Sequence, residues 1–471
     1  MIDLKNLTIE KAHESLKNGD FTCRELVEEY LKVIKEKNKD LNAYLEVYSD
    51  VLAQADSAEM KFQDGTAGLL TGIPFAVKDN ILVEGHVASA GSKILENYKA
   101  SYDATVIKKL KSAGAVILGR ANMDEFAMGS STENSAYGVT KNPYDTTRVA
   151  GGSSGGPACA VAMDGALFAL GTDTGSSVRQ PASFCGVVGL YPTYGSVSRY
   201  GAIAMGNSLD QIGPLTKTVR DTEIIFDTIS GCDELDATSI PDEFRGKISK
   251  ETKRIGVPRH LLTGEGIDKE LIENFEKSLK KLESAGYEII EIEMPYTKYS
   301  LPVYYIIMPA EVSTNLSRFD GIRYGYSAPG KDLMEVYKNS RGQGFGKETR
   351  RRILLGSYVL SHGYYDAYYN KAKKIRSLIA NDFNNAFKKV DVIAMPTSPF
   401  PAFKIGEKAN DPLAMYFADI FTVPANIAGV PAISIPNNKT KNHLPLDIQF
   451  IAPKLGESRL FEIGKKFETI R

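Results

Sequence analysis

The chain has 471 residues, 43% of them hydrophobic and 24% charged, which is ordinary for a folded globular protein and excludes a disordered or collagen-like chain. Its 57 basic and 58 acidic residues give a net charge of −1, so we expect no direct nucleic-acid binding through a bulk positive field. The four cysteines form no C-x-x-C pair, so we expect a reducing compartment such as the cytoplasm. No apolar leader and no run of about 18 apolar residues is visible, so we expect no membrane association.

Predicted helices and strands alternate in the first part of the chain. Residues 73–78 (IPFAVK) form a short apolar run between turn residues, which predicts a buried strand that ends in Lys78. An amphipathic helix is predicted over 104–113, with Gly114 at its end, and a strand over 115–118 follows it. Helices and strands joined by short turns predict a mostly parallel or mixed sheet that helices cover.

Small residues dominate the segment 150–195, where backbones can approach one another closely. Pro157 follows a cluster of glycines and predicts the start of a helix. Residues 166–170 (ALFAL) predict a strand that leads into a second loop of glycine and serine, over 171–177. Two glycine-serine loops are therefore predicted to bracket a buried helix and a buried strand.

The polar and charged segment 239–253 predicts a boundary, or seam, between two parts of the chain. Beyond it we expect a helix over 268–285, a strand over 287–292, a long helical region over 346–387 and strands over 390–394, 432–435 and 445–451. The whole pattern predicts the α/β class, with a single large domain over residues 1–471. It would hold a mixed many-stranded sheet covered by helices, and a helical subregion near 295–390.

The sequence contains no phosphate-binding P-loop and no metal-ligand spacing, so we expect neither a metal ion nor an organic cofactor. Residues 152–156 match G-x-S-x-G, the nucleophile elbow of α/β-hydrolases, with Ser154 at its centre. That mechanism needs a histidine later in the chain. His362 and His443 could serve, but the residues around them form no motif that marks a catalytic histidine. This alternative is therefore the weaker one.

The second loop offers a different nucleophile. Glycine within it lets successive backbone N–H groups turn inward and form an anion nest. Ser177, at the end of this nest, would have an oxyanion hole beside it. With the histidines unpromising, the candidate base is Lys78, which can accept a proton only if burial lowers its pKa.

Together, three motifs of this chain are similar to those of the amidase signature family. They are GIPFAVKDN (72–80), GGSSGG (151–156) and GTDTGSSVRQPA (171–182). The resemblance implies a single α/β domain and a Ser–cisSer–Lys triad. In that triad Ser177 is the nucleophile, Ser153 the bridging serine in a cis peptide and Lys78 the base. It also implies an oxyanion hole made by the N–H groups of Thr174, Gly175, Ser176 and Ser177.

Almost the whole chain further resembles the A subunits of aspartyl/glutamyl-tRNA amidotransferases. The resemblance is carried by GSSTENSAYG (129–138), SRFDGIRYGY (317–326) and the segment 411–436, among others. It implies glutamine as the small-molecule amide substrate, with the carboxylate of glutamine held by Arg352 and its ammonium by Asp419. It also implies partner subunits, one of which binds tRNA and receives the ammonia.

Several residues near the site depart from that pattern. They are Ala150, Pro157, Ser176, Tyr191, Ser196 and Asp447. Ser176 stands where a glycine is expected and adds a Cβ atom inside the nest. Two alternatives therefore stay open. One is a stand-alone amidase, esterase or urethanase acting on a larger apolar amide, ester or carbamate; the other is an inactive scaffold protein, against which the intact serines and lysine argue.

Overall fold

The computed structural model of the chain describes residues 2–244 and 251–471, so part of the predicted seam over 239–253 lies outside the described residues. In the described residues, eleven strands form one mixed sheet in the order β1-β3-β2-β4-β6-β5-β10-β11-β9-β7-β8. The strands are β1 (Tyr44–Val47), β2 (Pro74–Lys78), β3 (Val116–Ala121), β4 (Phe168–Asp173), β5 (Val188–Tyr191), β6 (Gln211–Thr216), β7 (Arg254–Val257), β8 (Glu288–Glu291), β9 (Val392–Met395), β10 (Ala432–Lys439) and β11 (Pro445–Ile451).

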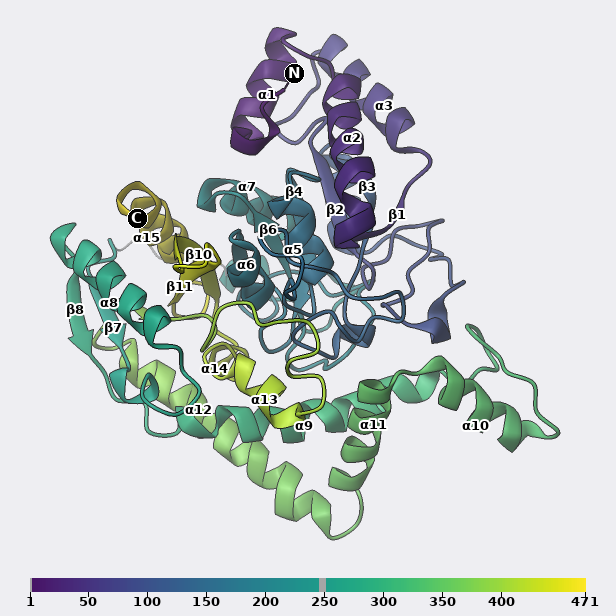
Figure 1. The fold of residues 1–471 in the computed structure, drawn as a ribbon, viewed down its shortest axis with the longest axis vertical. Coiled ribbons are helices and arrows are strands. Elements are labelled where there is room, and N and C mark those ends of the chain that lie inside the picture. Colours follow the sequence, from purple (N-terminus) through teal and green to yellow (C-terminus); the bar gives the residue numbers. More distant parts are fainter. Residues whose placement is uncertain (1, 245–250) are drawn as a thin grey trace.

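Helices surround this sheet (Figure 1). They are α1 (Ile9–Asn18), α2 (Cys23–Leu41), α3 (Val51–Gln63), α4 (Thr105–Ser112), α5 (Gly155–Ala162), α6 (Arg179–Cys185), α7 (Val219–Ile229), α8 (Lys269–Ser284), α9 (Ser300–Asn315), α10 (Leu333–Gly344), α11 (Lys347–Val359), α12 (Lys371–Ala386), α13 (Pro412–Tyr416), α14 (Val423–Ala428) and α15 (Glu457–Ile470). Short helical turns include η3 (Glu125–Ala127), η8 (Tyr365–Asn370) and η9 (Phe417–Asp419). The α/β class and the mixed, helix-covered sheet predicted from the sequence are confirmed.

Parallel pairing places the ends of two strands side by side at the site. Strand β2 pairs in parallel with β3 on one side and with β4 on the other, and Phe75 is in register with Phe168. Their rings stack with centroids 4.7 Å apart. Since parallel strands run in the same direction, the carboxyl end of β2 at Lys78 and that of β4 at Asp173 meet at one edge of the sheet.

The predicted strand over 73–78 is confirmed as β2, and the helix predicted over 268–285 is confirmed as α8 with Asp268 as its N-cap. The prediction of one long helical region over 346–387 is wrong in its continuity. The chain forms α11, turns through Gly363 at a φ of +83°, and resumes as the π-helical turn η8 and then α12. Helix α11 ends at Val359 with Leu360 as its C-cap, and Gly363 supplies the left-handed turn before η8, a conformation that glycine adopts at little cost.

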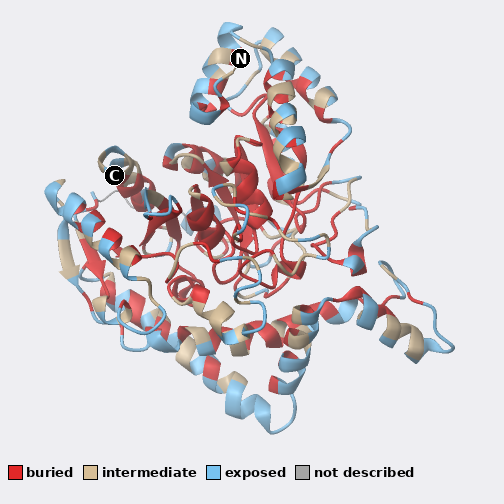
Figure 2. Cartoon of the chain, viewed as in Figure 1, coloured by how far each residue is buried: buried red, intermediate tan, exposed pale blue. Residues whose placement is uncertain are grey.

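Burial is deepest around the central helices and strands, and the outer helices keep an exposed face (Figure 2). Helices α5 and α6 are buried almost throughout, and α5 consists of small residues that allow close packing. In the lower part of Figure 1, α9 to α12 extend away from the sheet as a helical layer. No helix in residues 2–244 and 251–471 combines the length and apolarity needed to cross a bilayer.

Candidate active site

Lys78 ends β2 inside the protein, where its ammonium contacts three side chains from other elements. Its Nζ donates to Ser153 Oγ at 2.7 Å, to Ser154 Oγ at 2.8 Å and to Thr172 Oγ1 at 2.9 Å. The carbonyl oxygen of Thr172 lies 3.1 Å away. Lys78 and Ser153 are fully buried. The sequence-predicted lysine and bridging serine are therefore in direct contact, although 75 residues separate them.

The glycine-serine loop that carries Ser153 is packed too tightly for side chains. The Gly152–Ser153 peptide bond is cis. A Cβ atom on Gly152 would lie 2.1 Å from Asp124 Oδ2 and 2.5 Å from the backbone nitrogen of Ser131. Glycine is required at this position because the backbone and the carboxylate occupy the space of a side chain. The motif therefore fixes where Ser153 lies relative to Lys78.

Burial makes the protonated form of Lys78 less stable than that of an exposed lysine. It lowers the pKa of Lys78 to about 7, against the opposing effect of the negative charges of Asp124, Asp173 and Asp210. Burial also raises the pKa of Asp124 and of Asp210 to about 6 each, which weakens the charge they place near the lysine at mildly acidic pH. A large fraction of Lys78 is then neutral near neutral pH and can accept a proton.

The second predicted loop runs from Thr174 to Ser177 between β4 and α6. No N–H group of these four residues donates a hydrogen bond to another residue in the described part of the chain. The loop is held from outside: the N–H of Ser154 donates to the carbonyl of Ser177 at 3.0 Å. A Cβ atom on Gly175 would lie 2.9 Å from the hydroxyl of Tyr304, so this position also requires glycine. Backbone N–H groups without partners favour an anion or an oxyanion.

Ser177 is 4% exposed, and its hydroxyl makes no hydrogen bond to a residue that the structure describes. Ser154 is buried, bonded to Lys78 and to the carbonyl of Thr172, whereas His362 and His443 are exposed. No hydrogen bond joins Ser154 to a histidine within residues 2–244 and 251–471. The nucleophile elbow that would use Ser154 therefore has no support in this arrangement.

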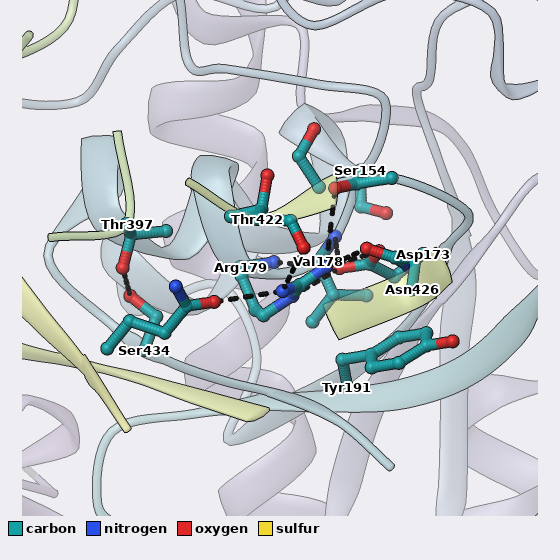
Figure 3. A network of polar contacts seen from close by, with 12 residues as sticks. Ser154, Asp173, Val178, Arg179, Tyr191, Thr397, Thr422, Asn426 and Ser434 are labelled. Carbon is teal, nitrogen blue, oxygen red and sulfur yellow. Dashed lines mark hydrogen bonds and ion pairs between the residues drawn. The ribbon is translucent and has the colours of Figure 1, made fainter. Parts of the chain in front are cut away.

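A buried ion pair directly after β4 holds the loop in place (Figure 3). Arg179 donates to both oxygens of Asp173, at 3.0 and 3.1 Å, and Asn426 donates to the same carboxylate at 2.9 Å. Burial acts to raise the pKa of Asp173, but the positive charge of Arg179 and these hydrogen bonds lower it by more, so the pKa of Asp173 lies below the ordinary value. Tyr191, one of the departures from the family pattern, places its ring 4.9 Å from the guanidinium of Arg179, a cation–π contact that Figure 3 displays.

Arg352 lies in α11 and is 3% exposed. Its Nε donates to Glu348 Oε1 at 2.8 Å, and Tyr416 donates to the same oxygen at 3.0 Å. The rings of Tyr305 and Tyr416 stack 3.8 Å apart, and the guanidinium lies 5.5 Å from each. The predicted carboxylate-holding arginine is thus buried and already bonded to a carboxylate of its own helix.

Asp419, the predicted ammonium-binding residue, is 4% exposed at the end of η9. Ser176 donates to its Oδ1 at 2.6 Å, Ser130 contacts both of its oxygens at 3.0 Å, and Tyr305 approaches Oδ2 at 3.4 Å. Burial raises the pKa of Asp419 to about 6, although the bonds from Ser176 and Ser130 act in the opposite direction. Tyr305 therefore lies between Asp419 and Arg352 and joins the two.

Sequence reasoning missed the partners that surround the predicted residues. Thr172, Ser130, Tyr305, Glu348 and Tyr416 come from separate elements, and Asp124 closes the loop around Gly152. Thr172, Ser130 and Tyr416 stand inside segments that carry the family resemblance, but the sequence predicts no role for them, and Tyr305 and Glu348 lie outside those segments. Across residues 2–244 and 251–471, no group of three or more His, Cys, Asp and Glu side chains is arranged to hold a metal ion.

The chain matches the family model Amidase over residues 25–461. It is 52% identical to the A subunit of the glutamyl-tRNA(Gln) amidotransferase from Thermoanaerobacter pseudethanolicus, over 99% of this chain and 97% of that protein. The crystal structure of the corresponding A subunit of the glutamyl-tRNA(Gln) amidotransferase from Thermotoga maritima superimposes with a TM-score of 0.82 at 42% identity, covering 100% of this chain and 96% of that one. A peptide amidase in complex with chymostatin superimposes with a TM-score of 0.84 at 27% identity, covering 99% and 98%.

Proposed function

Because this chain belongs to the amidase family, we propose that it cleaves its substrate with Ser177 as the nucleophile and with Ser153 and Lys78 as the proton relay. The chain is an amidase, a hydrolase of carbon–nitrogen bonds other than peptide bonds. The observation that carries the proposal is the 2.7 Å contact between Lys78 Nζ and Ser153 Oγ in a fully buried setting. A neutral lysine there can take the proton that a serine hydroxyl releases.

In the first step the Ser177 oxygen attacks the amide carbonyl. Its proton passes to the Ser153 oxygen, while the proton of Ser153 passes to Lys78. The carbonyl becomes an oxyanion, which the unpartnered N–H groups of Thr174 to Ser177 would stabilise. When the tetrahedral intermediate collapses, Lys78 returns a proton through Ser153 to the leaving nitrogen, and an ester of Ser177 remains. Water attacks this ester, with the relay acting as base again, and releases the acid.

For the substrate we propose glutamine, with ammonia as the nitrogen product passed to partner subunits. Relatives named as amidotransferase A subunits match this chain over nearly their whole length, which supports this choice. Arg352 would hold the carboxylate of glutamine and Asp419 its ammonium. Both groups are buried near Tyr305, and their charges are opposite to those of the groups they would bind.

A specific observation favours a second candidate, a stand-alone amidase or esterase for a larger apolar amide, ester or carbamate. Arg352 is bonded to Glu348, and Asp419 accepts from three hydroxyl groups. Both recognition groups therefore already have partners without a substrate. An apolar substrate would leave these contacts intact, whereas the ammonium of glutamine would compete with the hydroxyl donors of Asp419.

The substitution Arg352→Ala distinguishes the two candidates. If glutamine is the substrate, losing one hydrogen bond between charged groups costs roughly 1.5–3 kcal/mol, and KM for glutamine rises about 10- to 100-fold. If the substrate is apolar, turnover of an aryl amide changes little. Normal aryl-amide turnover in Arg352→Ala, together with no hydrolysis of glutamine by the unaltered chain, would reject glutamine.

A further inference from the structure

The hydroxyl of Ser176 is bonded to a group that the proposed mechanism assigns to substrate binding. Ser176 is 1% exposed and its Oγ lies 2.6 Å from Asp419 Oδ1. The two residues are 243 positions apart in the chain, one in the loop after β4 and the other in η9. This contact joins the loop of the proposed oxyanion hole to the carboxylate proposed to bind an ammonium group.

The carboxylate of Asp419 already has three hydroxyl donors around it. A carboxylate offers about four lone-pair sites, two on each oxygen. Oδ1 accepts from Ser176, the single hydroxyl proton of Ser130 is shared between the two oxygens at 3.0 Å, and Tyr305 approaches Oδ2. The shortest of these contacts is the one from Ser176. An ammonium group that binds Asp419 therefore competes with these hydroxyl donors, whereas a substrate without that charge does not.

From this geometry we propose that Ser176 is a positioning residue that holds Asp419 and sets how tightly the site binds the ammonium group of a substrate, by competing with it for Oδ1. The inference rests on the proposed role of Asp419 in substrate binding. Ser176 acts through Asp419 and not on the substrate itself. Its hydroxyl competes with the ammonium for Oδ1, so removing it should favour ammonium-bearing ligands over otherwise identical ligands without that charge.

The test compares glutamine with glutaramate, which has the same amide and carboxylate but no ammonium. Each is measured as a competitive inhibitor of aryl-ester hydrolysis by the full chain, which gives a Ki for each ligand. In Ser176→Ala the ratio of Ki for glutaramate to Ki for glutamine should rise roughly 10-fold, the size of one hydrogen bond to a charged group. Ser130→Ala removes another donor to Asp419 and should shift the ratio in the same direction.

The chain offers a matched control. Ser131 is buried next to Ser130 but makes no hydrogen bond to Asp419, so Ser131→Ala should leave the ratio unchanged. Asp419→Asn should lower the preference for glutamine, because it removes the negative charge. If Ser176→Ala changes both Ki values equally, or if only Ser131→Ala moves the ratio, the inference is wrong.

This design separates the inference from the proposed function. If the unaltered chain hydrolyses glutamine but Ser176→Ala leaves the Ki ratio unchanged, the inference fails and the proposed substrate stands. If the unaltered chain does not bind glutamine but Ser176→Ala does, the inference holds and glutamine is not the natural substrate. If neither protein binds glutamine, both are rejected.

Discussion

Lys78 acquires its chemistry from its place in the fold. An exposed lysine with a pKa of about 10.4 is neutral in only about one molecule in 2,500 at pH 7. Burial lowers the pKa of Lys78 to about 7, so about half of the molecules carry a neutral amine at that pH. The two serines and Thr172 around Nζ can accept hydrogen bonds from the ammonium form without fixing it as an ion pair.

The pH dependence of the rate follows from this pKa. Below about pH 7 Lys78 is protonated and cannot accept the proton of the serine relay, so kcat/KM should fall as the pH drops from 8 to 6. The measurement is kcat/KM for a neutral amide, whose own charge does not change in this range. A flat profile between pH 6 and pH 8 would contradict the role of Lys78 as the base.

Replacing the nucleophile should abolish turnover. Ser177→Ala leaves no oxygen to form the acyl-enzyme, so amide hydrolysis should fall to background. His362→Ala and His443→Ala should retain most of it, because both histidines are exposed. The measurement is the initial rate of the three variants on one amide. A histidine variant as inactive as Ser177→Ala would restore the alternative in which Ser154 is the nucleophile.

Lys78→Ala should affect amides more than activated esters. An amine leaves only if it is protonated in the transition state, whereas a phenolate of low basicity leaves without a proton. The expected result is therefore a larger drop in kcat/KM for an aryl amide than for the matching nitrophenyl ester. Equal losses on the two substrates would mean that Lys78 has a structural role only.

Residues inside glycine-rich motifs could be predicted from the sequence, and their partners could not. Ser153 and Ser177 stand in motifs whose small residues signal close backbone approach, and Lys78 ends an apolar run that predicts a buried strand. Ser130 lies in the segment 129–138, which carries the family resemblance, and Glu348 lies outside any such motif. In neither case does the local sequence indicate the contact with Asp419 or with Arg352. The same holds for the bond from Ser176 to Asp419, whose consequence depends on a residue 243 positions away.

Among the elements, α11 has an unusual beginning. Its N-cap is Gly346, which has no side chain to accept from the first turn. Glu125, from η3 in the core, holds this end of the helix in a different way: it accepts from the N–H of Gly346 itself at 2.8 Å and from the hydroxyl of Thr349 at 2.5 Å. Its other oxygen accepts from Ser92 at 2.5 Å. A residue of the core therefore fixes the start of the helix that carries Arg352.

The substitution Glu125→Gln tests this cap. The amide keeps the shape but loses one acceptor oxygen and the negative charge that the helix N-terminus favours. We expect the free energy of unfolding to fall by about 1–3 kcal/mol, as for a lost cap or a buried hydrogen bond. KM for glutamine should rise more than KM for an aryl amide, since only glutamine uses Arg352. Equal changes in both KM values would show that Glu125 does not position Arg352.

The bounds of an element could be predicted where a single sequence pattern covered the whole segment. Strand β11 has the predicted bounds of 445–451, because an apolar run lies between turn signals. Strand β6 was not predicted, because Gly213 and Pro214 inside it are residues typical of turns. A Cβ atom on Gly213 would lie 1.9 Å from the carbonyl oxygen of Leu190, so the close approach of β5 explains this glycine. Such a contact between distant strands leaves no trace in local sequence.

At the scale of the whole molecule, the two halves of the chain meet along one pair of strands. In the described chain, the strands from residues 44–216 occupy one side of the sheet and those from 254–451 the other, joined by β5 and β10. Arg179 crosses this boundary with bonds to Thr422, Asn426 and Gln449. Helix α6 packs on β10, and α15 packs on α7. We therefore propose that residues 1–471 form a single domain.

This proposal predicts that both halves lose structure together. Ile433 lies in β10, is fully buried and is in register with Leu190 of β5 and Phe450 of β11. Ile433→Ala removes three buried carbons at the boundary, so the free energy of unfolding should fall by about 2–5 kcal/mol. Hydrogen exchange in increasing denaturant, followed by mass spectrometry, reports on each strand separately. In one domain, peptides from β2–β4 and from β9–β11 should shift to the same lower midpoint.

An exposed residue of similar size serves as the control for the buried substitution. Leu413 is 76% exposed on α13, and Leu413→Ala should change the free energy of unfolding by less than about 0.5 kcal/mol. If Ile433→Ala shifts only the peptides of β9–β11, the sheet consists of two units that unfold independently, and the boundary at β5 and β10 is an interface between domains. A common shift instead means that the β5–β10 pairing, together with the bonds of Arg179, makes the two sides of the catalytic loop one cooperative structure.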